Sequence, residues 1–268
     1  MARLGLNLLG APELWLAGRP VTLERQKALA LLAYLAIGGQ PQSREHLAAL
    51  LWPDLAAPRA QAALRQALWT IGSTLGSEWI ASDRVRVELV AADLDLDVHA
   101  FRSMVQRARR EALDSDILAA AVARYRGDLL AGLTLRDAEA FDEWRFFESE
   151  GLRADLIWAL DALGEAYSAR NQYAQALDFA RRRLALDQLH EPAHRRLIRL
   201  YAAAGQRQYD ECVRVLQAEL GAEPEAETTR LYQAVRAERA SQNAGAGRVS
   251  AWRRGPAGSG GGIGAGAG

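Results

Sequence analysis

Residues 190–194 read His-Glu-Pro-Ala-His and match the H-E-x-x-H pattern of zinc proteases. In those enzymes both imidazoles bind zinc from one face of a helix, and the glutamate acts as the base. Here Pro192 stands between the histidines, and proline favours the first turn of a helix. We therefore expect His190 to lie before the helix and to point elsewhere. His46 and His99 remain, no third ligand is apparent, and the pattern predicts a turn rather than a metal site.

Two other features could serve an enzyme. Residues 255–261 begin like a phosphate-binding loop, but Gly261-Gly262 stand where that loop needs Lys followed by Ser or Thr. Cys212 is the only cysteine, and its place within a helical repeat predicts core packing rather than a reactive thiol. A single cysteine cannot form an internal disulfide, which fits a reducing, cytoplasmic location. The sequence thus predicts a protein that is not an enzyme and has no cofactor.

A third set of side chains could bind nucleic acid. A helix that begins near Pro58 presents polar and aromatic residues on its outer face: Arg59, Arg65, Gln66, Trp69 and Thr70. Arginine can pair bidentately with guanine, and glutamine with adenine. A following hairpin adds Arg84 and Arg86, and Ser43-Arg44 opens another helix, where a backbone phosphate could bind. These residue types fit an ordinary solvated helix face equally well, so both interpretations stay open.

The elements that would position these residues can be read from the apolar spacing. Within residues 4–23, alternating apolar residues predict three short strands. Three helices follow, the first ended by Gly38-Gly39, the second N-capped by Ser43 and the third closed by Gly76. In the third helix Leu64, Leu68, Ile71 and Leu75 are expected to face inward. Residues 79–81 and 85–89 read as a terminal hairpin, which completes a compact α+β unit over residues 1–91.

Residues 93–240 form a second, almost wholly helical region. Leu163, Tyr167 and Asn171 recur 34 residues later as Leu197, Tyr201 and Gly205, and 34 residues is the tetratricopeptide period. The repeat is interrupted at one place. Asn171 is followed by nine residues to the equivalent of Tyr209, whereas Gly205 is followed by only four. We expect the helix after Gly205 to be shortened at its start. Residues 241–268 are mostly Gly, Ala and Ser, which predicts a disordered tail.

The net charge of the chain does not exclude a nucleic-acid partner. The chain carries 33 Lys and Arg against 33 Asp and Glu, and its formal charge is zero. By region the net charge is +2 for residues 1–91, −5 for 92–240 and +3 for the tail. A mildly basic N-terminal unit leaves DNA binding open, although +2 is far below the footprint of a strong binder. The longest apolar run, Ala28–Ile37, is too short to cross a membrane, so no membrane association is expected.

Two groups of motifs resemble known bacterial families. Residues 3–91 resemble the winged helix-turn-helix DNA-binding domain of response regulators, through Ala17-Gly18-Arg19-Pro20-Val21, the run Lys27–Ala36, Ser43-Arg44-Glu45, Leu51-Trp52 and Leu64-Arg65-Gln66-Ala67-Leu68. Residues 93–236 resemble the bacterial transcriptional activation domain of the antibiotic-regulatory activators, through Asp97-Val98, Tyr125-Arg126-Gly127-Asp128, Phe141-x-x-Trp144, Glu191-x-x-His194-Arg195, Gln208-Tyr209, Glu223-Pro224 and Glu227-Thr228.

This resemblance implies a mainly α fold, in which a winged helix-turn-helix precedes TPR-like repeats. It implies a transcriptional regulator, most simply an activator, that reads double-stranded promoter DNA with its third helix and wing. The repeats would contact RNA polymerase or another protein, and a homodimer would offset weak binding by one domain. The alternative is a protein-interaction module whose winged helix has lost useful DNA affinity. The sequence departs from the family at two places. Thr70–Thr74 replaces a commonly arginine-rich stretch, which favours the alternative. About five residues are missing after Arg207, so the last repeat is expected to pack differently.

Overall fold

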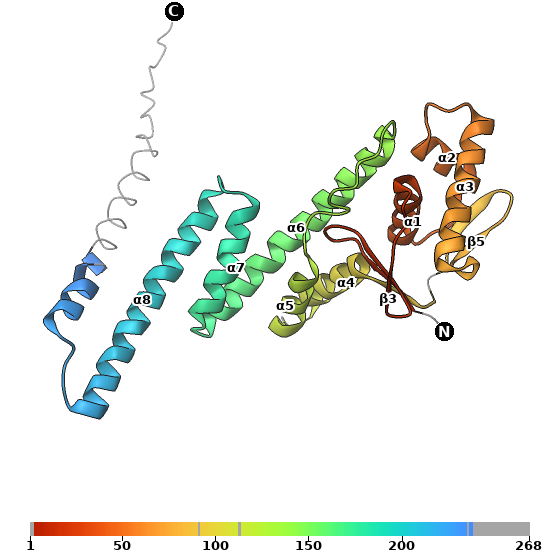
Figure 1. The fold of residues 1–268 in the computed structure, drawn as a ribbon. Coiled ribbons are helices and arrows are strands. Elements are labelled where there is room, and N and C mark those ends of the chain that lie inside the picture. The colour runs from red at the N-terminus through yellow and green to blue at the C-terminus, as the bar shows by residue number, and fades with distance from the viewer. Residues whose placement is uncertain (1–2, 91, 112–113, 235, 238–268) are drawn as a thin grey trace, which may run out of the picture. The chain divides into compact units, whose positions relative to one another are not determined.

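The computed structural model describes residues 3–90, 92–111, 114–234 and 236–237 of the chain (Figure 1). The predicted tail, residues 241–268, lies outside the described residues. The chain divides into two compact units, Met1–Ala166 and Tyr167–Gly268. Each unit is described by itself, and the first contains the residues expected to bind DNA.

A four-stranded sheet opens the first unit. Strands β1 (Leu4–Asn7), β2 (Glu13–Leu16) and β3 (Arg19–Val21) form an antiparallel meander. The alternating pattern predicted the three strands, and the structure adds their pairing. A fourth strand, β7 (Leu94–Leu96), pairs in parallel with β1 and completes the order β3-β2-β1-β7. No strand was predicted at β7, because its partner β1 is distant in sequence and no hairpin turn joins the two strands. The expected domain boundary between residues 91 and 93 therefore lies within the first unit, Met1–Ala166.

Three helices and a small second sheet follow the meander. Helices α1 (Gln26–Gly38), α2 (Arg44–Leu51) and α3 (Ala57–Leu75) lie close to the predicted bounds, and Gly39 ends α1 in the left-handed conformation. A 3-10 turn, η1 (Ser77–Trp79), takes the place of the first predicted strand residue, Trp79, and is followed by β5 (Ile80–Ser82) and β6 (Arg86–Leu89). A further two-residue strand, β4 (Gln42–Ser43), pairs with β6 and gives the order β4-β6-β5.

A buried aspartate joins the meander to the helices that follow. Asp97, the first residue of α4 (Asp97–Arg110), is only 3% exposed. Its two carboxylate oxygens accept hydrogen bonds from the backbone N–H groups of Leu8 (2.9 Å) and Leu9 (2.8 Å). Burial raises the pKa of Asp97, while these hydrogen bonds favour the charged form and oppose the rise. One side chain thus satisfies the two N–H groups that follow the end of β1.

The start of a long helix packs against the helix-turn-helix. Helix α5 (Ser115–Arg124) precedes a loop, after which α6 (Glu139–Ala169) begins. The ring of Trp144 on α6 lies edge-on to Tyr34 of α1, with centroids 4.8 Å apart, and Phe141 is fully buried. Phe146 and Phe147 contact each other but are 58% and 64% exposed, because they fall on the outer face of α6.

The second unit contains one complete helical hairpin core. The end of α6 turns at Asn171, whose φ is +59°, into α7 (Tyr173–Leu186), and α8 (Glu191–Leu220) returns beside it. The core is made of small and aliphatic side chains from α7 and α8: Ala176, Ala180, Leu197 and Leu200. Tyr167 adds its ring, which lies 5.5 Å from that of Phe179. This arrangement is the helix–turn–helix that the 34-residue period predicts.

One expectation about the repeats is wrong. The helix after Gly205 was expected to be shortened at its start, yet it has no separate start, because α8 runs without interruption from Glu191 to Leu220. Only four residues lead from Gly205 to Tyr209 where the first repeat has nine, so too little chain remains to form a turn and restart a helix. The two helices that a second repeat would contain are therefore fused into one (Figure 1).

Replacing Asp97 by Asn should destabilise the first unit. Asparagine keeps the shape but has one acceptor oxygen, so a buried backbone N–H of Leu8 or Leu9 would face an amide donor. An unsatisfied buried polar group costs about 1–3 kcal/mol, and we expect a loss of that size in the free energy of unfolding. Asp95→Asn is the matched control, since the Arg3–Asp95 ion pair is largely exposed. Equal stability of the two variants in urea denaturation would contradict this role for Asp97.

Candidate nucleic-acid interface

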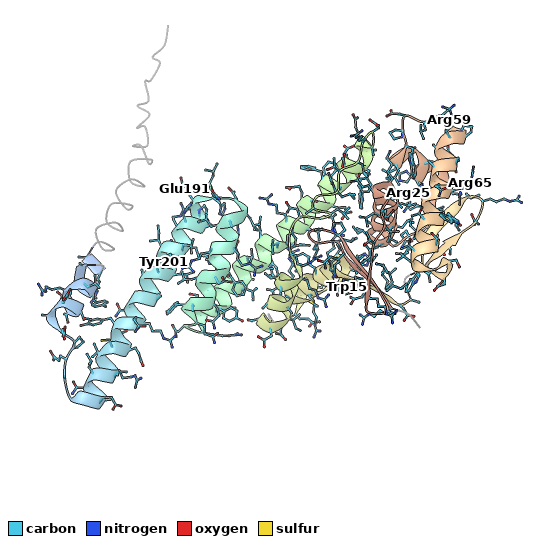
Figure 2. All side chains as sticks on the ribbon, in the orientation of Figure 1. Trp15, Arg25, Arg59, Arg65, Glu191 and Tyr201 are labelled. Carbon is cyan, nitrogen blue, oxygen red and sulfur yellow. The ribbon has the colours of Figure 1, made fainter. Side chains whose placement is uncertain are left out.

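Helix α3 is anchored by one face and open on the other. Its buried side chains recur every three or four residues and pack into the core of the first unit: Ala60, Leu64, Ala67, Ile71 and Leu75. Leu68, expected to be buried, is half-buried at the edge of this face. The opposite face carries Arg59, Arg65 and Gln66, all exposed, and Trp69, which is 68% exposed. Figure 2 shows Arg59 and Arg65 projecting from this helix.

The hydroxyl groups further along α3 are already engaged. Thr70 is half-buried, and its hydroxyl donates to the carbonyl oxygen of Gln66 (2.9 Å). The hydroxyl of Ser73 donates in the same way to the carbonyl of Thr70 (3.0 Å). Since each hydroxyl has one hydrogen, both oxygens remain available to a ligand only as acceptors. Residues 70–75, the second half of α3, contain neither Arg nor Lys, so this part of the helix offers hydroxyl oxygens but no cationic group.

The wing, which consists of β5, β6 and the turn at residues 83–85 between them, is held in shape by an aspartate. The carboxylate of Asp83 accepts hydrogen bonds from the backbone N–H groups of Val85 (2.6 Å) and Arg86 (2.7 Å). These bonds, first of all the one from Arg86, lower the pKa of Asp83, because they stabilise its charged form. Arg84 and Arg86 are exposed on this turn, and Val85 between them is 64% exposed. Sequence reasoning missed Val85, although an apolar residue between two arginines in a turn is a usable signal.

Ser43 and Arg44 lie beside the wing. Ser43 pairs with Arg86 through the β4–β6 ladder, and its hydroxyl oxygen accepts from the N–H of His46 (3.0 Å), which makes it the N-cap of α2 as predicted. The N–H of Arg44 donates to the carbonyl of Val85 (2.8 Å), and its guanidinium donates to the carbonyl of Asp83 (3.3 Å). The structure therefore brings Ser43, Arg44, Arg84 and Arg86 together in one basic group around the Asp83 turn. The sequence did not indicate this, because a two-residue strand leaves no pattern.

Two long side chains fix the orientation of α2. The amide of Gln61 on α3 donates to the carbonyl of Arg44 (3.3 Å). The ammonium of Lys27 on α1 donates to the carbonyl of Leu51 (2.6 Å) at the other end of α2. Burial lowers the pKa of Lys27, although Asp137 and Asp54 oppose the change. The only lysine of the chain is thus a positioning group within the helix-turn-helix and does not belong to the exposed basic face.

The protease-like histidines do not form a site. His190 precedes α8 as its N-cap, and its Nδ1 accepts from the N–H of Ala193 (3.2 Å), as Pro192 predicted. His194 instead contacts the carbonyl oxygen of Gln188 through Nε2 (2.9 Å). Within the described ranges, no group of three His, Cys, Asp or Glu side chains could hold a metal ion. The described helices are also too short or too polar to cross a membrane.

Comparison with known proteins places the chain in a family. No curated protein sequence matches it. Among solved structures, it is similar to Mycobacterium tuberculosis EmbR in complex with a low-affinity phosphopeptide, with a TM-score of 0.58 at 20% sequence identity. That alignment covers 94% of this chain and 72% of EmbR, and it supports the fold of a winged helix-turn-helix followed by helical repeats. Residues 96–236, more than half of the chain, match the bacterial transcriptional activator domain. The chain therefore belongs to the bacterial transcriptional activator domain family, a family of transcriptional regulators.

Proposed function

We propose that this regulator binds double-stranded promoter DNA in the cytoplasm through α3 and the wing, and that it activates transcription. The observation that carries the proposal is the joint placement of two exposed groups on the first unit. One is the α3 face of Arg59, Arg65, Gln66 and Trp69, and the other is the basic group around Asp83. Both are held by buried or hydrogen-bonded neighbours, so little ordering is needed on binding.

Helix α3 would enter the major groove, as the recognition helix of a helix-turn-helix does. Arg65 and Gln66 lie on the exposed face, where bidentate pairing with guanine and adenine is geometrically accessible. Trp69 offers an exposed apolar ring to thymine methyl groups or sugars, and Thr70 an acceptor oxygen. Arg59, near the start of the helix, would contact base edges or the adjacent phosphates.

The wing group would contact the DNA backbone. Arg84 and Arg86 extend from a turn, and Arg44 and the N-cap Ser43 lie beside them at the start of α2. Arginine, backbone N–H groups and helix N-termini are the usual phosphate ligands in such complexes. Five arginines in the two groups are offset by nearby carboxylates such as Asp83 and Glu88, in line with a net charge of only +2 over residues 1–91. We therefore expect weak, strongly salt-sensitive binding by one chain.

The repeats would supply contacts with RNA polymerase or another protein. On α6, within the activator domain, Phe146 and Phe147 are 58% and 64% exposed, and such apolar surface is typical of interaction sites. A second candidate function is an interaction module without useful DNA binding. The observation that favours it is the uncharged second half of α3, whose Thr70 and Ser73 hydroxyl hydrogens are occupied. DNA-binding measurements separate the two.

Replacing Arg65 by Ala should reduce sequence-specific binding. A bidentate base contact is worth about 1–3 kcal/mol, which corresponds to about 5–150-fold in affinity for the specific site. Binding to unrelated DNA should change much less. Fluorescence anisotropy with DNA from upstream of the chain's own gene measures both. Arg19→Ala, which removes an exposed arginine at the start of β3, is the matched control. Equal affinities of the Arg65 and Arg19 variants would remove Arg65 from the proposed interface.

Replacing Arg84 by Ala should act differently. A phosphate contact carries no sequence information, so affinity should fall by a similar factor for specific and unrelated DNA. The same anisotropy assay at fixed salt gives the two ratios. A loss confined to the specific site would show that Arg84 reads a base and would contradict its placement on the backbone.

Asp83→Ala should loosen the wing while leaving the fold intact. The N–H groups of Val85 and Arg86 would lose their acceptor, so their amide hydrogens should exchange faster with solvent. The melting temperature should stay close to that of the parent, because the side chain is exposed. Hydrogen exchange by NMR checks this, with Glu88→Ala on the adjacent strand as the control. Unchanged protection at residues 85 and 86 would show that the strands alone hold the turn.

A further inference from the structure

We infer that two copies of this chain pair through α8, each supplying the helix that the other's second repeat lacks. The observation behind this is the fusion of two repeat helices into one. In the first repeat the chain reverses at Asn171, and α7 packs back on the end of α6 through the Tyr167–Phe179 contact. In the second repeat the equivalent position, Gly205, lies inside the continuous helix α8. The two halves of α8 therefore cannot pack on each other within one chain.

Each half of α8 remains part of an intact pair. The first half, up to Gly205, packs on α7 through Leu197 and Leu200. The second half packs on the helical segment 226–234, where the rings of Tyr209 and Tyr232 stack with centroids 4.0 Å apart. The second half extends past the end of α7, as Figure 1 shows. What is missing is the contact between these two helix pairs, because a turn near Gly205 would be needed to fold the two halves of α8 against each other.

The faces that this missing contact would bury are apolar and open. On the first half, Ile198 and Tyr201 are 58% and 50% exposed. On the second half, the repeat alignment equates Val213 with Leu184, which packs against the core of the first hairpin, yet Val213 is 36% exposed. A groove of about 340 Å³ lies along the same stripe, lined by Ala202, Gly205, Tyr209, Cys212, Leu231 and Tyr232.

Charge identifies the occupant as a second copy. Residues 173–205 carry six Arg against three Asp and Glu, a net charge of +3. Residues 206–234 carry three Arg against six Asp and Glu, a net charge of −3. If two α8 helices cross antiparallel about a two-fold axis, the basic pair of each copy meets the acidic pair of the other, twice over. Exchange of an identical element between copies is a low-cost route to a dimer, and a shortened hinge favours it.

Small residues lie where the two helices would cross. The Tyr167–Phe179 contact of the first repeat corresponds to Tyr201 and Gln208 in the second. In the pair of chains, Tyr201 of one copy therefore lies opposite Gln208 of the other, and the two-fold axis passes close to Gly205. Residues 202–205 read Ala-Ala-Ala-Gly. A Cβ placed at Gly205 would meet no neighbouring atom of the described chain within 4 Å, so this side of the helix is open to a partner. Two helix backbones can approach closely there.

Molar mass and cross-linking test the pairing directly. Size-exclusion chromatography with light scattering of the full chain should give twice the mass of one chain. In the variant Ile198→Cys, the new thiol should form an intermolecular disulfide with Cys212 of the other copy upon mild oxidation. One helical turn away from the Tyr201–Gln208 pair, positions 197–198 of one copy lie against position 212 of the other. Within a single α8 these positions are about 21 Å apart at ~1.5 Å per residue, too far for an internal bond. The parent chain is the control. Its two Cys212 thiols would also be about 20 Å apart in the pair, at ~1.5 Å per residue, so it should not cross-link.

Restoring the hinge should reverse the pairing. Inserting a copy of residues 173–177 between Arg207 and Gln208 supplies the five missing residues, so the second repeat can close within one chain and the mass should fall to that of a monomer. A five-residue Gly-Ser insertion within 221–225 is the matched control and should remain dimeric, with helical content checked by circular dichroism. A monomeric parent at every concentration, no cross-link in Ile198→Cys, or an insertion variant as dimeric as its control would each overturn the proposal.

Discussion

The buried carboxylate of Asp97 is the contact on which the first unit depends. Its two oxygens accept the N–H groups of Leu8 and Leu9, so the end of β1 and the start of α4 share one anchor. Around it, β7 adds to the sheet, and the backbone around residues 128–131 hydrogen-bonds to residues 8–10. These bonds join the meander to the activator-domain helices, and Trp144 on α6 then packs against Tyr34 of α1. The helix-turn-helix is thus in contact with residues of the activator domain on this side.

The contacts that hold α3 and the wing in place explain how a weakly charged surface would still bind DNA. The inner face of α3 is buried from Ala60 to Leu75, and the wing turn is tied by Asp83, so the exposed arginines sit on ordered supports. Binding by preorganised groups loses less conformational entropy than binding by mobile ones. The same supports limit affinity, because Lys27 and the hydroxyls of Thr70 and Ser73 serve the fold itself. Cooperation between two copies paired through α8 would compensate for that limit.

Local patterns predicted most of the fold, and long-range contacts account for what they missed. The apolar spacing in α1, α2 and α3, the Ser43 cap and the 34-residue period all describe neighbours within one helix or hairpin. The strands β4 and β7 were not predicted because their partners, β6 and β1, are distant in sequence. The clustering of Arg44 with the wing depends on β4 and was missed for the same reason. The continuous α8 was not foreseen because a missing hinge changes which helices can meet, without changing the helical pattern itself.

The salt dependence of DNA affinity tests the central claim most directly. Each phosphate neutralised contributes about −0.9 to the slope of log affinity against log salt concentration. With Arg44, Arg84 and Arg86, and in addition Arg59 if it contacts a phosphate, on the DNA backbone, the unmodified chain should show a slope of about −3 to −4 on DNA from upstream of its own gene. Specific DNA should also bind more tightly than unrelated DNA at each salt concentration. No binding at low salt, or an affinity independent of salt, would contradict DNA reading by α3 and the wing.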